Sequence, residues 1–312
     1  MRQYLWNRLA SGLLVLIGLS VFTFGLIQLI PGDPVRMMLG DKATKEQVEQ
    51  LRESLGLNKP LVEQYVSYVT GIAKGDFGTS IKTGQPVLEE IMARFPATLK
   101  MALFAMAFAI VLGIALGILA AKHKDTFIDR TVLTLATLGV SLPSFWVGLL
   151  LMMLFAVKLK WFPIAGGTGL HDLVLPAATL GVYASTIICR LTRSGMLEVL
   201  SQDYIRTARA KGIGERLILF RHAFRNVLIP VVTVIGLQIA SLLGGAVLIE
   251  QVFSWPGIGT LAIDAIYSRD FPMIQGTTLF MGIIYVTVNI VMDLLYGLID
   301  PRIDISQQKA GA

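Results

Sequence analysis

The segment LASGLLVLIGLSVFTFGLIQLI, residues 9–30, contains no Asp, Glu, Lys or Arg. A helix rises about 1.5 Å per residue, so this segment is long enough to cross the roughly 30 Å of hydrocarbon in a bilayer. Arg2 and Arg8 precede it, as basic residues precede the apolar part of a signal peptide. It is longer than such a part, however, and leads into PGDP (31–34) without a small-x-small cleavage site. An uncleaved transmembrane helix is therefore predicted.

Five more apolar runs have comparable length, and the composition of the chain agrees with them. The runs cover residues 97–121, 131–157, 173–193, 227–249 and 275–299. Of the 312 residues, 54% are hydrophobic and 15% are charged, whereas a soluble chain carries about 25% charged residues. The mean hydropathy is +0.68. Transmembrane β-strands would instead alternate apolar and polar residues over about ten positions. We therefore expect an all-α integral membrane protein with six transmembrane helices.

The distribution of Lys and Arg predicts the orientation of these helices. If both termini are cytoplasmic, the inside segments contain 15 Lys and Arg residues, whereas the two short outside loops contain only Lys158, Lys160 and Arg269. Basic residues favour the cytoplasmic ends of spanning helices, so this orientation is the expected one. The net charge of +6 has the same explanation. The expected surroundings are therefore a lipid bilayer, and no nucleic acid partner is predicted.

The long segment that would lie outside contains helix signals of its own. Thr44-x-x-Gln47 is a capping box at the start of one helix. Asn58-Lys59-Pro60 opens another, because proline is favoured in the first turn. The predicted parts are an N-terminal transmembrane helix (1–30), an extracytoplasmic helical insertion (31–96), a core of transmembrane helices 2–6 (97–299, including the cytoplasmic segment 201–226) and a cytoplasmic tail (300–312).

Residue patterns typical of enzymes and metal sites are missing from the sequence. The chain has one cysteine, Cys189, and its three histidines lack HxxxH or HExxH spacing, so no metal site is expected. The apolar runs show no catalytic constellation, which argues against a membrane-embedded hydrolase. No GxxxxGKS or GxxxxGKT motif is present, so no Walker A loop can bind ATP. The sequence therefore predicts no catalytic residues and no cofactor on this chain.

Polar residues within the apolar runs are candidates for a pathway through the membrane, because placing them in lipid is costly. The third run is interrupted by SLPS (141–144), where proline frees carbonyl groups that then need protein or water partners; the alternative is a simple kink. Gln238 and Asn289 could equally form hydrogen bonds between helices. The pathway candidates are Ser141, Pro143, Ser144, Gln238, Ser241 and Asn289.

The segment 201–226, between the fourth and fifth runs, is basic and amphipathic. Ser201 is a suitable N-cap for a helix with Asp203 in its first turn, and Gly212 and Gly214 end that helix. The shared face of this helix comprises Tyr204, Ile205 and Ala208. A second short helix places Leu219, Phe220, Ala223 and Phe224 opposite Arg221, His222 and Arg225. This layout suits a groove on a partner protein. A helix on anionic lipid and a solvated, topology-setting loop are the alternatives.

The same segment resembles a known family. Gly212 is followed ten residues later by HAFR (222–225), which resembles the EAA loop of ABC importer permeases. DYIRTARAKG (203–212) with RHAFRN (221–226) is similar to that loop in the dipeptide, oligopeptide and nickel subfamily. Three further motifs extend the resemblance along nearly the whole chain: PGDP (31–34), GDFGTS (75–80) and EQVFSWPGIGTL (250–261). The N-terminal helix with a long outer insertion resembles the B-type of two paired permease subunits.

The resemblance implies a type I-like ABC importer permease core in the plasma (inner) membrane of a prokaryote. It implies a heterodimer with a second homologous permease, two cytoplasmic ABC ATPases that bind ATP and Mg, and an extracytoplasmic substrate-binding protein. The implied ATPase-coupling residues are Asp203, Tyr204, Arg206, Thr207, Ala208, Ala210, Lys211, Gly212, His222 and Arg225. Arg206 replaces the acidic first position of the EAA pattern, Thr207 the first alanine and Arg225 the terminal proline. A salt bridge through that acidic position therefore has no basis here.

The resemblance also suggests a role for EQVFSWPGIGTL, at the outer end of the fifth run. An outer gate or a docking turn for the binding protein is implied, and a plain re-entrant turn is the alternative. Its candidate residues are Glu250, Phe253, Pro256, Gly257 and Gly259. Trp161, Phe162 and Trp255 are expected at the membrane interface. Relatives handle dipeptides, oligopeptides, glutathione or nickel complexes. An ion-gradient-driven secondary transporter is the alternative function, but the inverted repeats and midplane charge pairs of that class are not visible.

Overall fold

The structure is a computed structural model that describes residues 2–29, 34–39, 43–54, 56–167 and 169–299. These residues form helices, and within them the one pairing of extended segments is an isolated β-bridge between Thr79 and Pro86. Most of the PGDP motif and the tail at 300–312 lie outside the described residues. The chain forms two compact units, Met1–Pro96 with Gly257–Ile290 and Ala97–Pro256 with Val291–Ala312. Residues 257–290 thus group with the N-terminal part, which the sequence-based division does not anticipate.

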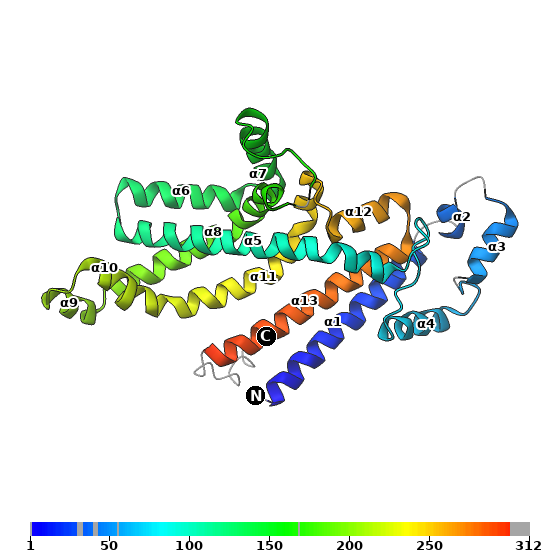
Figure 1. Ribbon diagram of the computed structural model, residues 1–312. Helices are drawn as coiled ribbons and strands as arrows, with labels where there is room; N and C mark the ends of the chain where they lie inside the picture. Colours follow the sequence, from blue (N-terminus) through cyan, green and yellow to red (C-terminus); the bar gives the residue numbers. More distant parts are fainter. Residues whose placement is uncertain (1, 30–33, 40–42, 55, 168, 300–312) are drawn as a thin grey trace. The chain divides into compact units, whose positions relative to one another are not determined.

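The first unit is built on α1 (Arg2–Leu29) and the part of α13 (Phe271–Ile299) that ends at Ile290, which run side by side (Figure 1). Gln275 on α13 donates from Nε2 to the carbonyl oxygen of Thr23 on α1 at 3.3 Å. The other helices are α2 (Pro34–Leu39), α3 (Lys45–Ser54), α4 (Leu61–Ala73), α12 (Ile258–Ser268) and the first turns of α5 (Val87–Lys122). The capping box is confirmed by reciprocal hydrogen bonds of 3.0 and 3.3 Å between Thr44 and Gln47.

Helix α4 packs against α1 through two tyrosine hydroxyls. Tyr65 shares a hydrogen bond of 2.9 Å with the hydroxyl of Ser20, and Tyr68 shares one of 3.3 Å with the hydroxyl of Thr23. The ring of Tyr65 also meets Phe24 edge-on, with 5.4 Å between the centroids. Both α1 hydroxyls already donate to backbone carbonyl oxygens of their own helix, at 2.8 Å to Ile17 and 3.1 Å to Ser20, so the tyrosine hydroxyls serve as the donors to them. The polar contacts therefore hold α4 at the C-terminal half of α1.

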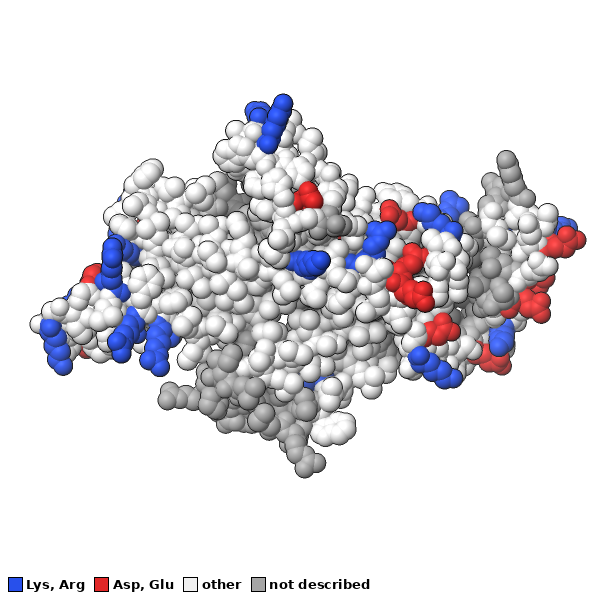
Figure 2. All heavy atoms as spheres, in the orientation of Figure 1, with Lys and Arg blue, Asp and Glu red and all other residues white. Residues whose placement is uncertain are grey.

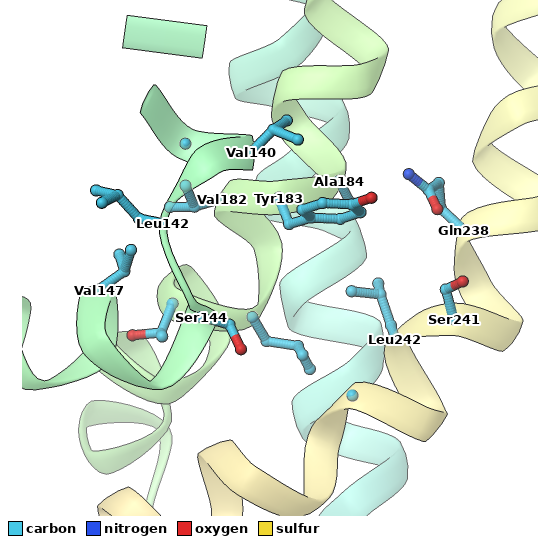
Figure 3. Close-up of a pocket in the computed structure, with 14 residues that line it drawn as sticks. Val140, Leu142, Ser144, Val147, Val182, Tyr183, Ala184, Gln238, Ser241 and Leu242 are labelled. Atoms are coloured by element: carbon cyan, nitrogen blue, oxygen red, sulfur yellow. The ribbon is translucent and has the colours of Figure 1, made fainter. Parts of the chain in front are cut away.

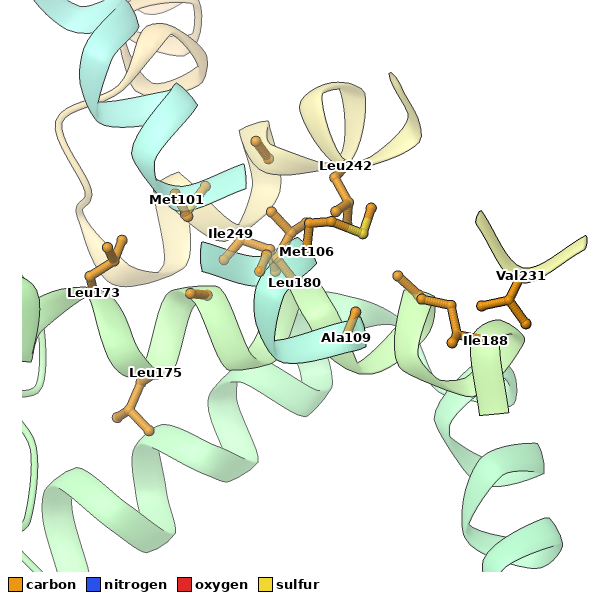
Figure 4. Packing of buried hydrophobic residues seen from close by; sticks show 14 of the residues in the cluster. Met101, Met106, Ala109, Leu173, Leu175, Leu180, Ile188, Val231, Leu242 and Ile249 are labelled. Atoms are coloured by element: carbon orange, nitrogen blue, oxygen red, sulfur yellow. The ribbon is translucent and has the colours of Figure 1, made fainter. Parts of the chain in front are cut away.

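The second unit contains the largest apolar core, formed mainly by α5, α8 (Leu170–Leu200) and α11 (Arg225–Phe253). Helix α6 (Phe127–Ser141) packs beside it against α8. Figure 4 shows its buried side chains, among them Met101, Met106, Ala109, Leu180, Ile188, Leu242 and Ile249. Gly113 and Gly117 allow α5 to lie close to α8. A Cβ atom on either glycine would approach a backbone carbonyl oxygen of α8 to 2.7 Å. Small residues four apart thus serve close helix packing.

The third apolar run is broken rather than kinked. Helix α6 meets α7 (Ser144–Leu151) and its π-helical continuation η1 (Met152–Lys158) at an angle of 113° (Figure 1). Leu142 has an extended backbone and Pro143 precedes α7 with a φ of −58°. The pyrrolidine ring disfavours helical geometry in the residue before it, so α6 has to end there. The predicted single span at 131–157 is therefore two helices with different directions.

The described residues contain five single helices that are long and apolar enough to cross a membrane, and a sixth crossing requires the bent α6–α7 pair. The five are Trp6–Gly25, Val87–Lys122, Leu170–Leu200, Glu215–Phe253 and Phe271–Leu295. Helix α6 alone has 15 residues, which corresponds to about 22 Å at 1.5 Å per residue. The chain is thus an all-α membrane protein, and α6 alone is shorter than the roughly 30 Å of hydrocarbon in a bilayer.

An ion pair with little exposure joins α6 to α8. Arg193 donates from Nε to Asp129 Oδ1 at 2.6 Å and from Nη2 to Asp129 Oδ2 at 2.7 Å. The backbone N–H of Asp125 donates to the same Oδ2 at 3.0 Å. The side chain of Asp129 is 3% exposed and that of Arg193 is 19% exposed. Because the pair is bidentate and the carboxylate has a further donor, it fixes the first turn of α6 against α8.

Candidate functional site

The segment 201–226 begins with α9 (Asp203–Ala210), whose N-cap is Gln202 rather than the predicted Ser201. Ser201 instead terminates α8, and its hydroxyl donates to the carbonyl oxygen of Glu198 at 2.7 Å. Because α8 continues to residue 200, the serine hydroxyl pairs with a free carbonyl oxygen in the last turn of α8 instead of a free N–H group in the first turn of α9. Asp203 occupies the first turn of α9 as predicted, where a carboxylate is favoured.

The buried side of α9 is narrower than the sequence predicts. Ile205 and Ala208 are buried, and they form a small cluster with Ile218. Tyr204 was expected on the same face, but it is 44% exposed. Its hydroxyl accepts a hydrogen bond of 2.8 Å from Nδ2 of Asn226. Tyr204 therefore joins the two ends of the segment at the surface, while Ile205 and Ala208 pack.

Gly212 and Gly214 have different structural roles. Gly212 has a φ of +76° and follows the C-cap of α9, where its N–H donates to the carbonyl oxygen of Arg209 at 2.9 Å. Gly214 is the N-cap of the next helix with a φ of −62°, which any L-residue can adopt. Neither glycine would bring a Cβ within 4 Å of another group. Backbone conformation therefore requires glycine at 212 and not at 214.

The predicted second short helix is part of a much longer one. Helix α10 (Glu215–Leu217) passes through the π-helical η2 (Ile218–Phe224) directly into α11. The wider π-turn changes which residues are inward: Ile218, Leu219 and Ala223 are buried, whereas Phe220 is 59% exposed. The predicted face with Phe220 inside is wrong for this reason. The second half of the segment is thus continuous with a long helix, whereas the sequence predicts a separate short helix there.

Most of the residues suggested for coupling lie on the surface. Figure 2 shows Lys and Arg gathered over α9 and α10 at one end of the second unit. The exposed ones of the suggested set are Asp203, Tyr204, Arg206, Thr207, Ala210, Lys211, Gly212 and Arg225, whereas His222 is partly buried and Ala208 is buried. Arg209 donates to Glu215 at 2.9 Å, and this hydrogen bond raises the pKa of the Arg209 guanidinium. Charge is therefore available for a partner surface, while Ala208 supports packing.

A cavity of 380 Å³ lies between the end of α6 and helices α7, α8 and α11 (Figure 3). Three of the six pathway candidates, Ser144, Gln238 and Ser241, line it. Its remaining lining residues are Gly139, Val140, Leu142, Val147, Thr179, Leu180, Val182, Tyr183, Ala184, Leu242 and Gly245. Sequence reasoning missed Thr179 and Tyr183, although two polar side chains four apart within one apolar helix share a face. The cavity is therefore mostly apolar, with a few hydroxyl groups and one amide.

The other three pathway candidates do not line this cavity. Ser141 donates within α6 to the carbonyl oxygen of Thr137 at 2.9 Å, and Pro143 shapes the break before α7. Asn289 lies on α13 in the first unit, where its Nδ2 donates to the carbonyl oxygen of Tyr285 at 2.8 Å. Each of these residues thus has a local structural role.

Gln238 is the unusual member of the cavity wall. It is 8% exposed, and its Nε2 has no hydrogen-bond partner among the described residues. A buried amide without a partner costs about 1–3 kcal/mol. The hydroxyl of Thr179, by contrast, donates within α8 to the carbonyl oxygen of Leu175 at 2.7 Å. Gln238 Nε2 is therefore the buried side-chain donor in the lining that has no partner among the described residues.

The residues around 250–259 are more buried than a docking turn suggests. Glu250 is fully buried and accepts a hydrogen bond of 2.6 Å from the hydroxyl of Thr98, and Phe253 is 3% exposed. Trp255 is 2% exposed and donates from Nε1 to the carbonyl oxygen of Ala97 at 2.9 Å, so its expected interfacial position is wrong. Pro256 is partly buried, Gly257 is the N-cap of α12 and Gly259 is buried within α12. Hydrogen bonds to Ala97 and Thr98 therefore hold this turn in place.

Comparisons with known proteins match nearly the whole chain to one kind of membrane transport protein. Residues 113–305 match the family described as binding-protein-dependent transport system inner membrane component, and residues 1–102 match the N-terminal part described for such membrane components. The chain is 43% identical to the Dipeptide transport system permease protein DppB of Alkalihalophilus pseudofirmus and 42% identical to the Glutathione transport system permease protein GsiC of Salmonella typhimurium. Each alignment covers 97% of this chain and 99% of the relative.

A solved structure shares the fold. The chain is similar to a subunit in the inward-facing MetNI methionine ABC transporter, with a TM-score of 0.57 over 67% of this chain and 96% of that chain. The two sequences are 19% identical, so this likeness concerns the fold alone. It agrees with helices packed as in the permease subunit of an ABC importer.

Proposed function

The chain belongs to the family of inner membrane components of binding-protein-dependent transport systems, and from this premise we propose how it works and what it carries. It is a permease subunit of an ATP-driven importer, with the type I-like permease core, and membership of this family sets aside the secondary transporter. We propose that it forms half of a membrane pathway for peptides or a related small solute: a dipeptide, an oligopeptide, glutathione or a nickel complex.

The proposed partners follow from the family. A second homologous permease completes the pathway, two cytoplasmic ABC ATPases bind ATP and Mg, and an extracytoplasmic binding protein delivers the substrate. Both termini and the segment 201–226 lie on the cytoplasmic side of the prokaryotic inner membrane. Hydrolysis of ATP occurs on the partner ATPases, and this chain transmits the motion. The turn at 250–259 belongs to the outer gate.

The observation that carries the coupling proposal is the arrangement of α9. This short helix and its C-cap present Arg206 and Lys211 outward, while Ile205 and Ala208 anchor it to Ile218, near the start of the long helix that contains α11. An exposed amphipathic helix suits a groove on a partner protein. Its anchor lies on the same helix that lines the cavity with Gln238 and Ser241. Movement of α9 would therefore be transmitted to the cavity wall.

Gentle extraction of the tagged chain from its native membrane tests this proposal. Mass spectrometry of the purified material should identify a second permease and two ATPase subunits, and the material should hydrolyse ATP. A lone polypeptide without ATPase activity, in a detergent that keeps comparable importers intact, would contradict the proposed assembly. The co-purified system then provides the binding protein for a screen of peptides, glutathione and nickel complexes.

A further inference from the structure

The cavity beside Gln238 has an unmet requirement for a hydrogen-bond acceptor. Gln238 is 8% exposed and its Nε2 has no partner among the described residues. In Figure 3 the amide of Gln238 and the hydroxyl end of Tyr183 point toward each other across the cavity. A volume of 380 Å³ is far more than one water molecule needs and lies at the lower end of the range for small-molecule sites. The space therefore suits a small ligand or one segment of a larger one.

The lining also indicates which chemistry the ligand has. Among the described residues no Asp, Glu, Lys, Arg or His lines the cavity, so it offers no counter-charge to a carboxylate or an ammonium group. Leu142, Leu180 and Leu242 supply apolar walls. A neutral amide carbonyl between small or apolar groups meets both conditions, because it accepts one hydrogen bond without bringing a charge. Peptides and glutathione both contain such amides.

We propose that this cavity is a substrate subsite in which Nε2 of Gln238 donates to an amide carbonyl oxygen of the passing substrate, while the charged ends of the substrate lie outside it. This inference rests on the proposed function, because it takes peptide-like substrates as given. It adds a specific recognition atom to the pathway. It also explains why an amide is kept in an apolar helix without a protein partner.

Uptake by the complete transporter in vesicles, with its ATPases and binding protein, tests the subsite. The variant Gln238→Met keeps the length of the side chain and removes the donor. Uptake of trialanine should fall about tenfold, in the upper range for one neutral hydrogen bond. Stimulation of ATP hydrolysis by the binding protein should remain near wild type. Thr192→Val is the matched control, because Thr192 is also a buried residue with an unpartnered side chain but lies outside the cavity.

A second comparison tests the carbonyl itself. Trialanine with its amide oxygens replaced by sulfur is a weaker acceptor, and the same binding protein delivers both peptides to every variant. The ratio of the two uptake rates should therefore be larger for wild type than for Gln238→Met, as in a double-mutant cycle. Equal ratios would overturn the assignment of Gln238 to a carbonyl group.

The remaining outcomes separate this inference from the proposed function. Normal trialanine uptake by Gln238→Met would overturn the subsite and leave the importer intact. If the Met variant does not assemble, Gln238→Leu is a second apolar replacement that cannot donate, and normal uptake by that variant would overturn the subsite equally. A wild-type complex that imports no trialanine with ATP would contradict the peptide substrate class, and the subsite with it.

Discussion

Gly212 occupies a backbone conformation that an L-residue adopts at a cost of about 1–2 kcal/mol. Its φ is +76°, and a Cβ there would meet no neighbour within 4 Å, so the strain comes from the backbone alone. We expect Gly212→Ala to reduce transport-coupled ATP hydrolysis about 5- to 30-fold, the factor that corresponds to this cost. Hydrolysis stimulated by the binding protein in reconstituted vesicles measures the effect, and membrane insertion should be unchanged.

Gly214 provides the control two residues away. Its φ of −62° is compatible with alanine and its surroundings are equally open. The transporter that carries Gly214→Ala should therefore show nearly the wild-type rate of ATP hydrolysis. Equal effects of the two substitutions would show that the positive φ at 212 is not what coupling requires. Gly212→Asp is expected to be more severe, since it also adds a negative charge to a basic surface.

Asp129 is the residue whose loss should most weaken the contact between α6 and α8. Asp129→Asn breaks a bidentate pair and leaves Arg193, which is 19% exposed, without its counter-charge. We expect a loss of about 2 kcal/mol of stability, since hydrogen bonds to charged groups contribute about 1.5–3 kcal/mol. Thermal unfolding of the purified complex in detergent measures it. Asp125→Asn is the control, because Asp125 is 80% exposed and lies 4.0 Å from Lys124. Unfolding temperatures that match for both variants would contradict the assignment.

Helix α4 depends on its two tyrosines for its position against α1. Tyr65→Phe combined with Tyr68→Phe removes both hydroxyl contacts but keeps the rings against Phe24. At about 1 kcal/mol for each hydrogen bond, the detached form of α4 should become roughly tenfold or more populated. Trypsin cleavage after Lys74, just beyond α4, should accelerate accordingly. Tyr267→Phe is the control at an 82% exposed tyrosine. An unchanged cleavage rate in the double variant would mean that other contacts hold α4.

Local signals within an element could be predicted from the sequence, whereas competition between elements could not. The capping box at Thr44 and Gln47 involves residues three apart, and the structure has it. Ser201 has the chemistry of an N-cap but terminates α8, because both helices can use it and only their lengths decide. Trp255 can suit either a membrane interface or an interior with an acceptor. Its acceptor, the carbonyl oxygen of Ala97, lies 158 residues away and leaves no mark in the local sequence.

The membrane orientation is a property of the whole molecule that labelling can test. In a Cys189→Ala background, Lys74→Cys and Lys211→Cys place one thiol on each side of the membrane in the proposed topology, and both positions are exposed. An impermeant maleimide should label position 74 in intact spheroplasts and position 211 only after permeabilisation. Cys189 itself is 2% exposed, so its removal should change little at the surface. The reverse labelling pattern would invert the topology.

The family and five of the six spans could be predicted because hydropathy and motifs accumulate over many residues. The candidate cavity could be predicted only in part. Ser144, Gln238 and Ser241 are polar within apolar runs, and that signal found them. The same signal selected Asn289, which bonds within its own helix in the other unit, because composition does not say which way a side chain faces. The angle of 113° between α6 and α7 could not be predicted for a similar reason, because a proline ends one helix without fixing the direction of the next helix.

The π-helical η2 accommodates one extra residue within one continuous helix. An α-helix turns about 100° per residue, and a π-turn holds one residue more than an α-turn. Deletion of a single residue within Ile218–Phe224 should therefore restore regular α-geometry and leave α9 and α11 in nearly the same rotational phase. The same deletion in the regular part of α11 would instead turn the basic surface about 100° around the helix axis, although every one of its side chains was still present. The direction of docking thus tolerates a change of length in this seven-residue segment and not in the helix that follows it.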